Sequence, residues 1–149
     1  MRNSKLKEQN IMYIENVTVN NVGCEKHYEF GKNWSRFLKV LDEQRIITAE
    51  DSLKEFLALD DLSDMRFLDV GCGSGLFSLC ARRMGAEVFS FDYDNDSVNC
   101  AKELKQRFFP TYDNWNIEQG DILDMKYMSS LRDYDIVYAW GSPHRKHAP

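Results

Sequence analysis

Apolar residues in the first third of the chain recur at the spacing of an amphipathic helix. The positions that follow the i, i+3, i+4, i+7 rule are Trp34, Phe37, Leu38 and Leu41. A second helix is predicted from about Thr48, because Thr48 and Asp51 have the spacing of a capping box. Its predicted buried stripe consists of Leu53, Phe56 and Leu57. Two helices therefore precede the rest of the fold.

Residues 66–140 alternate short apolar runs with longer helical patterns. The predicted strands are 66–70, 87–91, 116–119 and 135–140. The predicted helices are 75–84, with Gly85 as its C-cap, and 95–107. Strands that alternate with helices in this way favour a parallel sheet with right-handed crossovers. The predicted fold class is α/β, with a parallel sheet and N-terminal helices.

Length and composition indicate one soluble globular domain. The chain has 149 residues, of which 43% are hydrophobic and 29% charged. Its longest apolar runs are far shorter than the roughly 20 residues of a spanning helix, and the N-terminus lacks the apolar core of a secretory signal. The four cysteines are scattered without metal-ligand spacing, which favours free thiols in a reducing compartment. We expect a cytoplasmic protein without membrane contact or metal.

Charge argues against a nucleic-acid partner. The net charge is -5 and the pI about 5.2, whereas nucleic-acid binders carry a basic patch or a basic pI. The basic residues near position 105 alternate with Glu103 and are interpreted as a solvated helix face. His144 and His147 in the basic tail are interpreted as solvated as well.

The strongest local signal is a glycine loop between a predicted strand and a predicted helix. The segment from Asp69 to Gly75 reads DVGCGSG. Glycines at alternate positions let the backbone turn tightly and let a ligand approach main-chain N–H groups. A dinucleotide fingerprint would need a small residue at position 76, where the chain has Leu76. A nucleotide- or NAD-binding Rossmann protein is therefore an alternative that the sequence disfavours.

Acidic residues follow the next two strands. Asp92 ends the second strand, 23 residues after Asp69, where a carboxylate can accept ribose hydroxyls. Asp121 ends the third strand in the step Gly120-Asp121-Ile122. Cys72 within the loop is interpreted as a small residue beside a ligand, because no histidine lies nearby in sequence to activate a nucleophile.

With these motifs, residues 65–141 resemble class I S-adenosylmethionine-dependent methyltransferases. In that family the D-x-G-x-G-x-G loop approaches the methionine part of the cofactor, the second acid holds the ribose, and the G-D-apolar step holds adenine. The resemblance implies S-adenosylmethionine as cofactor and a Rossmann-like sheet of order 3-2-1-4. The cofactor-binding residues that it implies are Asp69, Gly71, Cys72, Gly73, Gly75, Asp92, Tyr93, Asp121, Ile122 and Trp140. The segment 31–34 would cover the methionine end.

The family sheet has further strands that this sequence does not supply. We expect an N-terminal arm or short strand over residues 1–30, a methyltransferase-like domain over 31–141 and a non-homologous tail over 142–149. A truncated product or fragment is one interpretation, and a minimal domain that a partner completes is the other. The apolar run 136–140 is then expected to be an exposed sheet edge through which the chain self-associates.

The resemblance implies methyl transfer to an acceptor, for which we expect a small molecule. No catalytic residue is assigned, and His27 and Tyr138 are candidates for a general base by chemistry and position alone. The alternative from another class is a cofactor-binding or interaction module without turnover.

Overall fold

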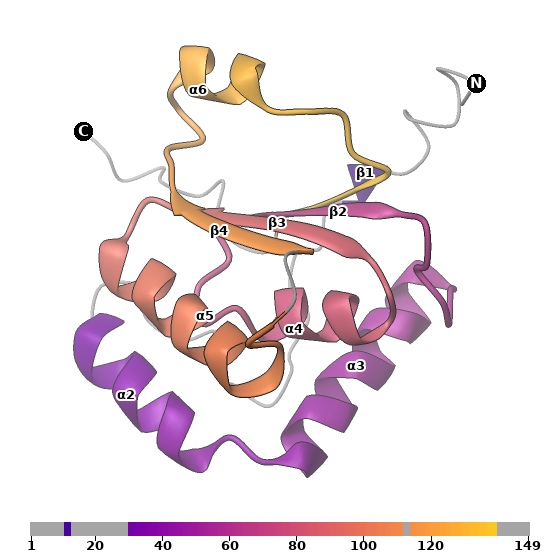
Figure 1. The fold of residues 1–149 in the computed structure, drawn as a ribbon, viewed down its shortest axis with the longest axis vertical. Coiled ribbons are helices and arrows are strands. Elements are labelled where there is room, and N and C mark those ends of the chain that lie inside the picture. Colours follow the sequence, from indigo (N-terminus) through magenta and orange to yellow (C-terminus); the bar gives the residue numbers. More distant parts are fainter. Residues whose placement is uncertain (1–10, 13–29, 112–113, 140–149) are drawn as a thin grey trace.

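Parallel strands form the frame of the molecule in the computed structural model, which describes residues 11–12, 30–111 and 114–139 (Figure 1). In this part of the chain they make a five-stranded sheet of order β1-β5-β2-β3-β4. The strands are β1 (Ile11–Met12), β2 (Arg66–Val70), β3 (Glu87–Asp92), β4 (Trp115–Gln119) and β5 (Ile136–Tyr138). Every pairing is parallel. The predicted order 3-2-1-4 is confirmed by the order of β4, β3, β2 and β5.

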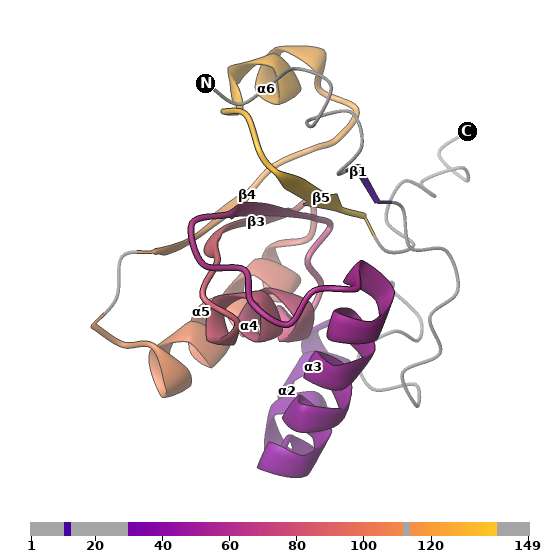
Figure 2. The same cartoon turned by 90° about the vertical axis from the view of Figure 1, so that its right-hand side faces the viewer.

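Helices cover the two faces of the sheet unequally. The helices are α2 (Phe30–Val40), α3 (Glu43–Leu57), α4 (Leu76–Arg83), α5 (Asn95–Phe108) and α6 (Met125–Ser130). The four longer helices lie on one side of the sheet and α6 on the other (Figures 1 and 2). Alternate residues of each strand therefore meet different surroundings, the thick helical layer or the α6 side.

The edge beside β5 differs from the prediction. Ile11 pairs with Val137, and Met12 pairs with Tyr138, so the N-terminal segment adds a short parallel strand there (Figure 2). The expectation that this edge is exposed is wrong for these two positions. Strand β5 is also shorter than predicted, since it spans Ile136–Tyr138. Pairing with a segment distant in sequence leaves no local pattern, which is why the sequence did not indicate it.

The predicted start of the second long helix is wrong. Helix α3 begins at Glu43, and the carboxylate of Asp42 caps it by accepting a hydrogen bond from Arg45 N over 2.8 Å. Thr48 lies inside the helix, where its hydroxyl donates to the carbonyl of Gln44. The side chain of Phe56 is 40% exposed. The buried stripe consists of Ile46, Ala49, Leu53 and Leu57.

The core lies between the sheet and the four longer helices. The Tyr138 ring packs between Phe67 and Phe77, at centroid distances of 5.7 and 5.3 Å. A smaller cluster lies on the α6 side and contains Leu68, Val70, Phe91 and Ala139. Helix α6 buries no side chain completely, and its sequence has no periodic apolar stripe. The sequence therefore did not predict this helix. No helix among the described residues is long and apolar enough to cross a bilayer.

Candidate functional site

The glycine loop after β2 has the tight, left-handed backbone that its glycines allow. Gly71, Gly73 and Gly75 have φ angles of 69°, 55° and 85°, in the left-handed region that other residues avoid. The backbone N–H groups of Gly71 and Cys72 donate to the carbonyl of Phe91 over 2.8 and 2.9 Å. These bonds attach the first part of the loop to the end of β3.

Gly75 and Gly73 meet different neighbours. A Cβ atom at Gly75 would lie 2.8 Å from the Cβ of Ala101, so only glycine lets α4 begin so close to α5. A Cβ at Gly73 would make an ordinary contact of 3.5 Å with the Trp34 ring of α2. The Trp34 indole also donates to Ser97 Oγ over 2.8 Å. Trp34 is therefore fixed against the loop.

Asp92 at the end of β3 contacts the loop directly. Its Oδ2 accepts a hydrogen bond from Gly73 N and its Oδ1 one from Asp94 N, each over 2.9 Å. The residue is 8% exposed. A carboxylate with two backbone donors at the mouth of a glycine loop is oriented to accept hydroxyl groups from a ligand bound across the loop.

Asp69 at the end of β2 lies deeper than Asp92. It is 2% exposed, and its Oδ2 accepts a hydrogen bond from the Ser78 hydroxyl over 2.5 Å. Burial raises the pKa of Asp69 to about 7, and the charge of Asp92 adds to the rise. The hydroxyl and backbone N–H of Ser78 lower the pKa of Asp69, because their hydrogen bonds favour the ionised carboxylate.

The acid after β4 completes the same edge of the sheet. Asp121 is half-buried, and its Oδ1 accepts a hydrogen bond from Leu123 N over 2.9 Å. The preceding Gly120 N donates to the Asp92 carbonyl over 3.0 Å, which ties this turn to the end of β3. Ile122 packs partly against the smaller apolar cluster, and Tyr93 is 55% exposed. Because the strands are parallel, the structure brings the acids at the ends of β2 and β3 and the acid after β4 to one carboxyl edge.

The remaining candidates divide into three groups. Burial, followed by the charges of Asp69 and Asp92, raises the pKa of Cys72 well above its ordinary value, so its thiol is no activated nucleophile. Tyr138 is 2% exposed and belongs to the core, so in this arrangement it does not reach an acceptor. Trp140 and His27 lie outside the described residues. Within those residues, no group of three histidine, cysteine or acidic side chains could hold a metal ion.

Three serines near the loop were missed by the sequence analysis. Ser78, Ser90 and Ser97 are each 0% exposed and hydrogen-bonded. Ser90 stands between Phe89 and Phe91 in β3, and this polar residue in a buried run was the available signal. Gly120 has no predicted role of its own, yet a Cβ there would overlap the ring of Tyr127.

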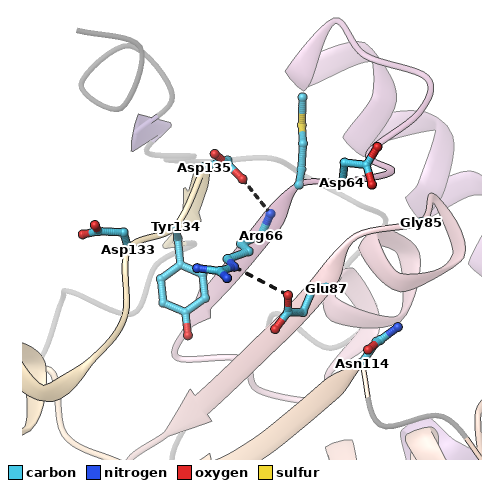
Figure 3. A pocket seen from close by; sticks show the side chains of 9 residues that line it. Asp64, Arg66, Gly85, Glu87, Asn114, Asp133, Tyr134 and Asp135 are labelled. Atoms are coloured by element: carbon cyan, nitrogen blue, oxygen red, sulfur yellow. Dashed lines mark hydrogen bonds and ion pairs between the residues drawn. The ribbon is translucent and has the colours of Figure 1, made fainter. Parts of the chain in front are cut away.

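A pocket lies at the other end of the strands. Figure 3 shows this cavity of about 770 Å³, in which Arg66 N donates to Asp135 Oδ2 and the Arg66 guanidinium lies 3.6 Å from Glu87. It opens at the amino ends of β2 and β3, opposite the glycine loop. Ligands of open parallel sheets bind at the carboxyl ends. The loop edge is therefore the better candidate site.

A family model described as "Methyltransferase domain" matches residues 61–148. The match covers more than half of the chain and includes the loop and all three acids. It also runs past residue 141, into the tail that the sequence analysis set apart.

Curated relatives match the same part of the chain. An uncharacterized protein of Haemophilus influenzae is 30% identical over 88 residues, which are 52% of this chain and 33% of the relative. A ribosomal protein L11 methyltransferase of Helicobacter hepaticus is 33% identical over 86 residues, 57% of this chain and 26% of the relative. The chain thus spans about a quarter to a third of the length of these relatives.

Solved structures share the fold. A magnesium protoporphyrin IX methyltransferase from Synechocystis, crystallised with bound S-adenosylmethionine, aligns with a TM-score of 0.55 at 20% identity, over 83% of this chain and 62% of that one. A precorrin-6y C5,15-methyltransferase from Geobacter metallireducens aligns with a TM-score of 0.53 at 18% identity, over 71% of this chain and 52% of that one.

Proposed function

The chain belongs to the methyltransferase domain family, and from this membership we propose that it binds S-adenosylmethionine at the glycine loop and transfers the methyl group to an acceptor. The observation that carries the proposal is the hydrogen bond from Gly73 N to Asp92, within an edge that also holds Asp69 and Asp121. A turn residue or helix cap alone would explain each acid separately. Their position at one edge of the sheet supports a shared ligand.

Each part of the site fits one part of this cofactor. The loop from Asp69 to Gly75 would take the methionine part, because its glycines allow close approach of main-chain N–H groups. Asp92 would accept the ribose hydroxyls, and Asp121 with Ile122 would lie along adenine. Tyr93 and Trp140 are proposed as further contacts. When bound, the cofactor supplies a sulfonium-activated methyl group.

The work of the protein in such a reaction is to position the two reactants and to exclude water. Trp34, fixed against Gly73 and bonded to Ser97, suits water exclusion at the methionine end. No described side chain is assigned as a general base. We propose a small-molecule acceptor, with a protein acceptor as the alternative, since relatives include methyltransferases named for ribosomal protein L11. A cytoplasmic location belongs to the same proposal.

A second candidate function is cofactor binding without turnover. It is kept as a candidate because, among the described residues, the cofactor edge has no assigned acceptor pocket. A dinucleotide site is opposed by Leu76, whose side chain is 3% exposed and packs into the core where that fingerprint requires a small residue.

Calorimetric titration of the full chain separates these functions. S-adenosylmethionine and S-adenosylhomocysteine are expected to bind, and NAD is expected not to bind. Binding of NAD alone would overturn the proposal. Transfer of a labelled methyl group to small-molecule and protein fractions then separates the enzyme from the binding module, which would retain the cofactor and release no methylated product.

A further inference from the structure

A row of four buried polar side chains runs from the edge strand β4 to Asp69. The indole Nε1 of Trp115 lies 2.9 Å from Ser90 Oγ, which lies 2.6 Å from Ser78 Oγ. The Ser78 hydroxyl in turn lies 2.5 Å from Oδ2 of Asp69. The row therefore links β4, β3, α4 and β2, and it ends at the first acid of the glycine loop.

Water has no access to the interior of this row. Trp115, Ser90 and Ser78 are each 0% exposed, and Asp69 is 2% exposed. Hydroxyl hydrogens in such a place must find their acceptors within the protein, because an unpaired buried donor is destabilising. The acceptor of each hydrogen in the row is therefore one of the neighbouring groups in the row.

The chemistry of the end groups fixes the direction of the hydrogen bonds. An indole N–H only donates, so Trp115 donates to Ser90. An ionised carboxylate only accepts, so the Ser78 hydroxyl gives its single hydrogen to Asp69. Ser78 must then accept from Ser90. All three hydrogens point towards Asp69.

Protonation of Asp69 disturbs this arrangement. A proton on Oδ2 would have to be donated to Ser78, whose own hydrogen would then turn to Ser90. The Ser90 hydrogen would lose its acceptor in the row. A proton on Oδ1 leaves the direction intact but replaces a charge-assisted hydrogen bond with a weaker neutral one. Both cases disfavour the neutral acid.

We propose that Ser78, supported by Ser90 and Trp115, is a positioning residue that keeps Asp69 ionised and oriented for the cationic methionine part of the cofactor. This inference rests on the proposed function. S-adenosylmethionine and S-adenosylhomocysteine both carry an ammonium group on that part, and an ionised carboxylate attracts it while a neutral acid does not. The affinity of the site then depends on the protonation of a carboxyl group that the serines control.

The groups around Asp69 make this control necessary. Burial raises the pKa of Asp69 to about 7, and the Asp92 carboxylate on β3 adds to the rise. Cys72 of the loop and Cys80 of α4 also face Asp69, and burial keeps both thiols neutral by raising their pKa values. On β5, Tyr138 is the register partner of Asp69. The hydrogen bonds of Ser78 counter the upward shift of the Asp69 pKa.

The test is calorimetric titration of the full chain with S-adenosylhomocysteine between about pH 5.5 and 8.5. In the parent protein, affinity should fall as the pH decreases through about 7. Ser78→Ala should raise the pH at which affinity falls by roughly one to two units, with about tenfold weaker binding at pH 7.5. Ser90→Ala should move it in the same direction by less, because Ser78 still donates. Ser78→Thr, which keeps the hydroxyl, should restore the parent profile.

Ser63→Ala is the matched control, since it also removes a serine hydroxyl that donates to a carboxylate, that of Asp61, but lies before β2, at the end of the strand opposite the glycine loop. It should leave the pH of half-maximal affinity unchanged. A Ser78→Ala protein whose affinity drops equally at every pH, or does not drop, would overturn the inference and indicate a structural role. Absence of binding in the parent at every pH would instead reject the proposed function.

Discussion

The backbone N–H of Gly73 donates a hydrogen bond to Oδ2 of Asp92 over 2.9 Å, which holds the middle of the glycine loop against the end of β3. The other oxygen of the same carboxylate accepts from Asp94 N, immediately before α5. One buried side chain therefore shapes the loop and the turn into the next helix. Substitution of Asp92 should affect the proposed ribose contact and the loop together.

Replacing Asp92 with alanine should weaken S-adenosylhomocysteine binding about tenfold or more. The variant loses charge-assisted hydrogen bonds worth about 1.5–3 kcal/mol. Calorimetry at one pH measures this directly. Asp96→Ala removes an exposed carboxylate from the first turn of α5 and serves as the control, which should bind like the parent. Equal affinities for both variants would exclude the ribose role of Asp92.

Substitutions at two loop glycines should separate binding from folding. Gly73→Ala has room beside Trp34, so its strain is limited to the positive φ, about 1–2 kcal/mol. In Gly75→Ala the new Cβ would lie 2.8 Å from the Cβ and 3.0 Å from the Cα of Ala101. This variant should therefore lower the melting temperature much more than Gly73→Ala does. Gly73→Val adds a branched side chain that disfavours the positive φ of the loop and lies against Trp34, and should abolish binding. A Gly73→Val protein that binds like the parent would show that the cofactor site lies elsewhere.

Asp69→Asn should raise the free energy of unfolding at pH 8. The pKa of Asp69 is about 7 in the folded state against 3.8 as an ordinary value, so folding binds a proton between these values. The stability of the parent should therefore decrease as the pH rises from about 4 to 7, by a total of the order of 4 kcal/mol. Asparagine cannot ionise, so the two proteins should converge near pH 4. Chemical denaturation at several pH values tests this, and a constant difference would contradict the assignment.

Removal of residues 1–12 should increase self-association. The deletion takes away the strand that pairs with Val137 and Tyr138, and unpaired apolar edges recruit other chains. Light scattering on the full and shortened chains gives the comparison. In the shortened chain, Val137→Lys should reduce association by placing a charge at the edge. If the full and the shortened chain both remain monomeric as the protein concentration is raised, edge pairing does not control association.

The sequence alone determined most of the parallel framework. Residues 66–70 were predicted with the bounds of β2, since a short apolar run that ends in glycines has no better local alternative. The acids at 69, 92 and 121 were assigned to one cofactor through the resemblance of the three motifs to class I methyltransferases. Local periods and the rules of βαβ connection were sufficient for the strands and helices that carry these acids.

Features that depend on contacts between distant segments required the tertiary structure. The capping of α3 by Asp42 and the exposure of Phe56 depend on where α3 packs, which periodicity alone left ambiguous. The pairing of Ile11 with Val137 joins residues that no short pattern relates. The row of four buried polar side chains that ends at Asp69 also exists only in the folded protein. Its hydrogen bonds join β4, β3, α4 and β2, and packing, not sequence spacing, brings these elements together.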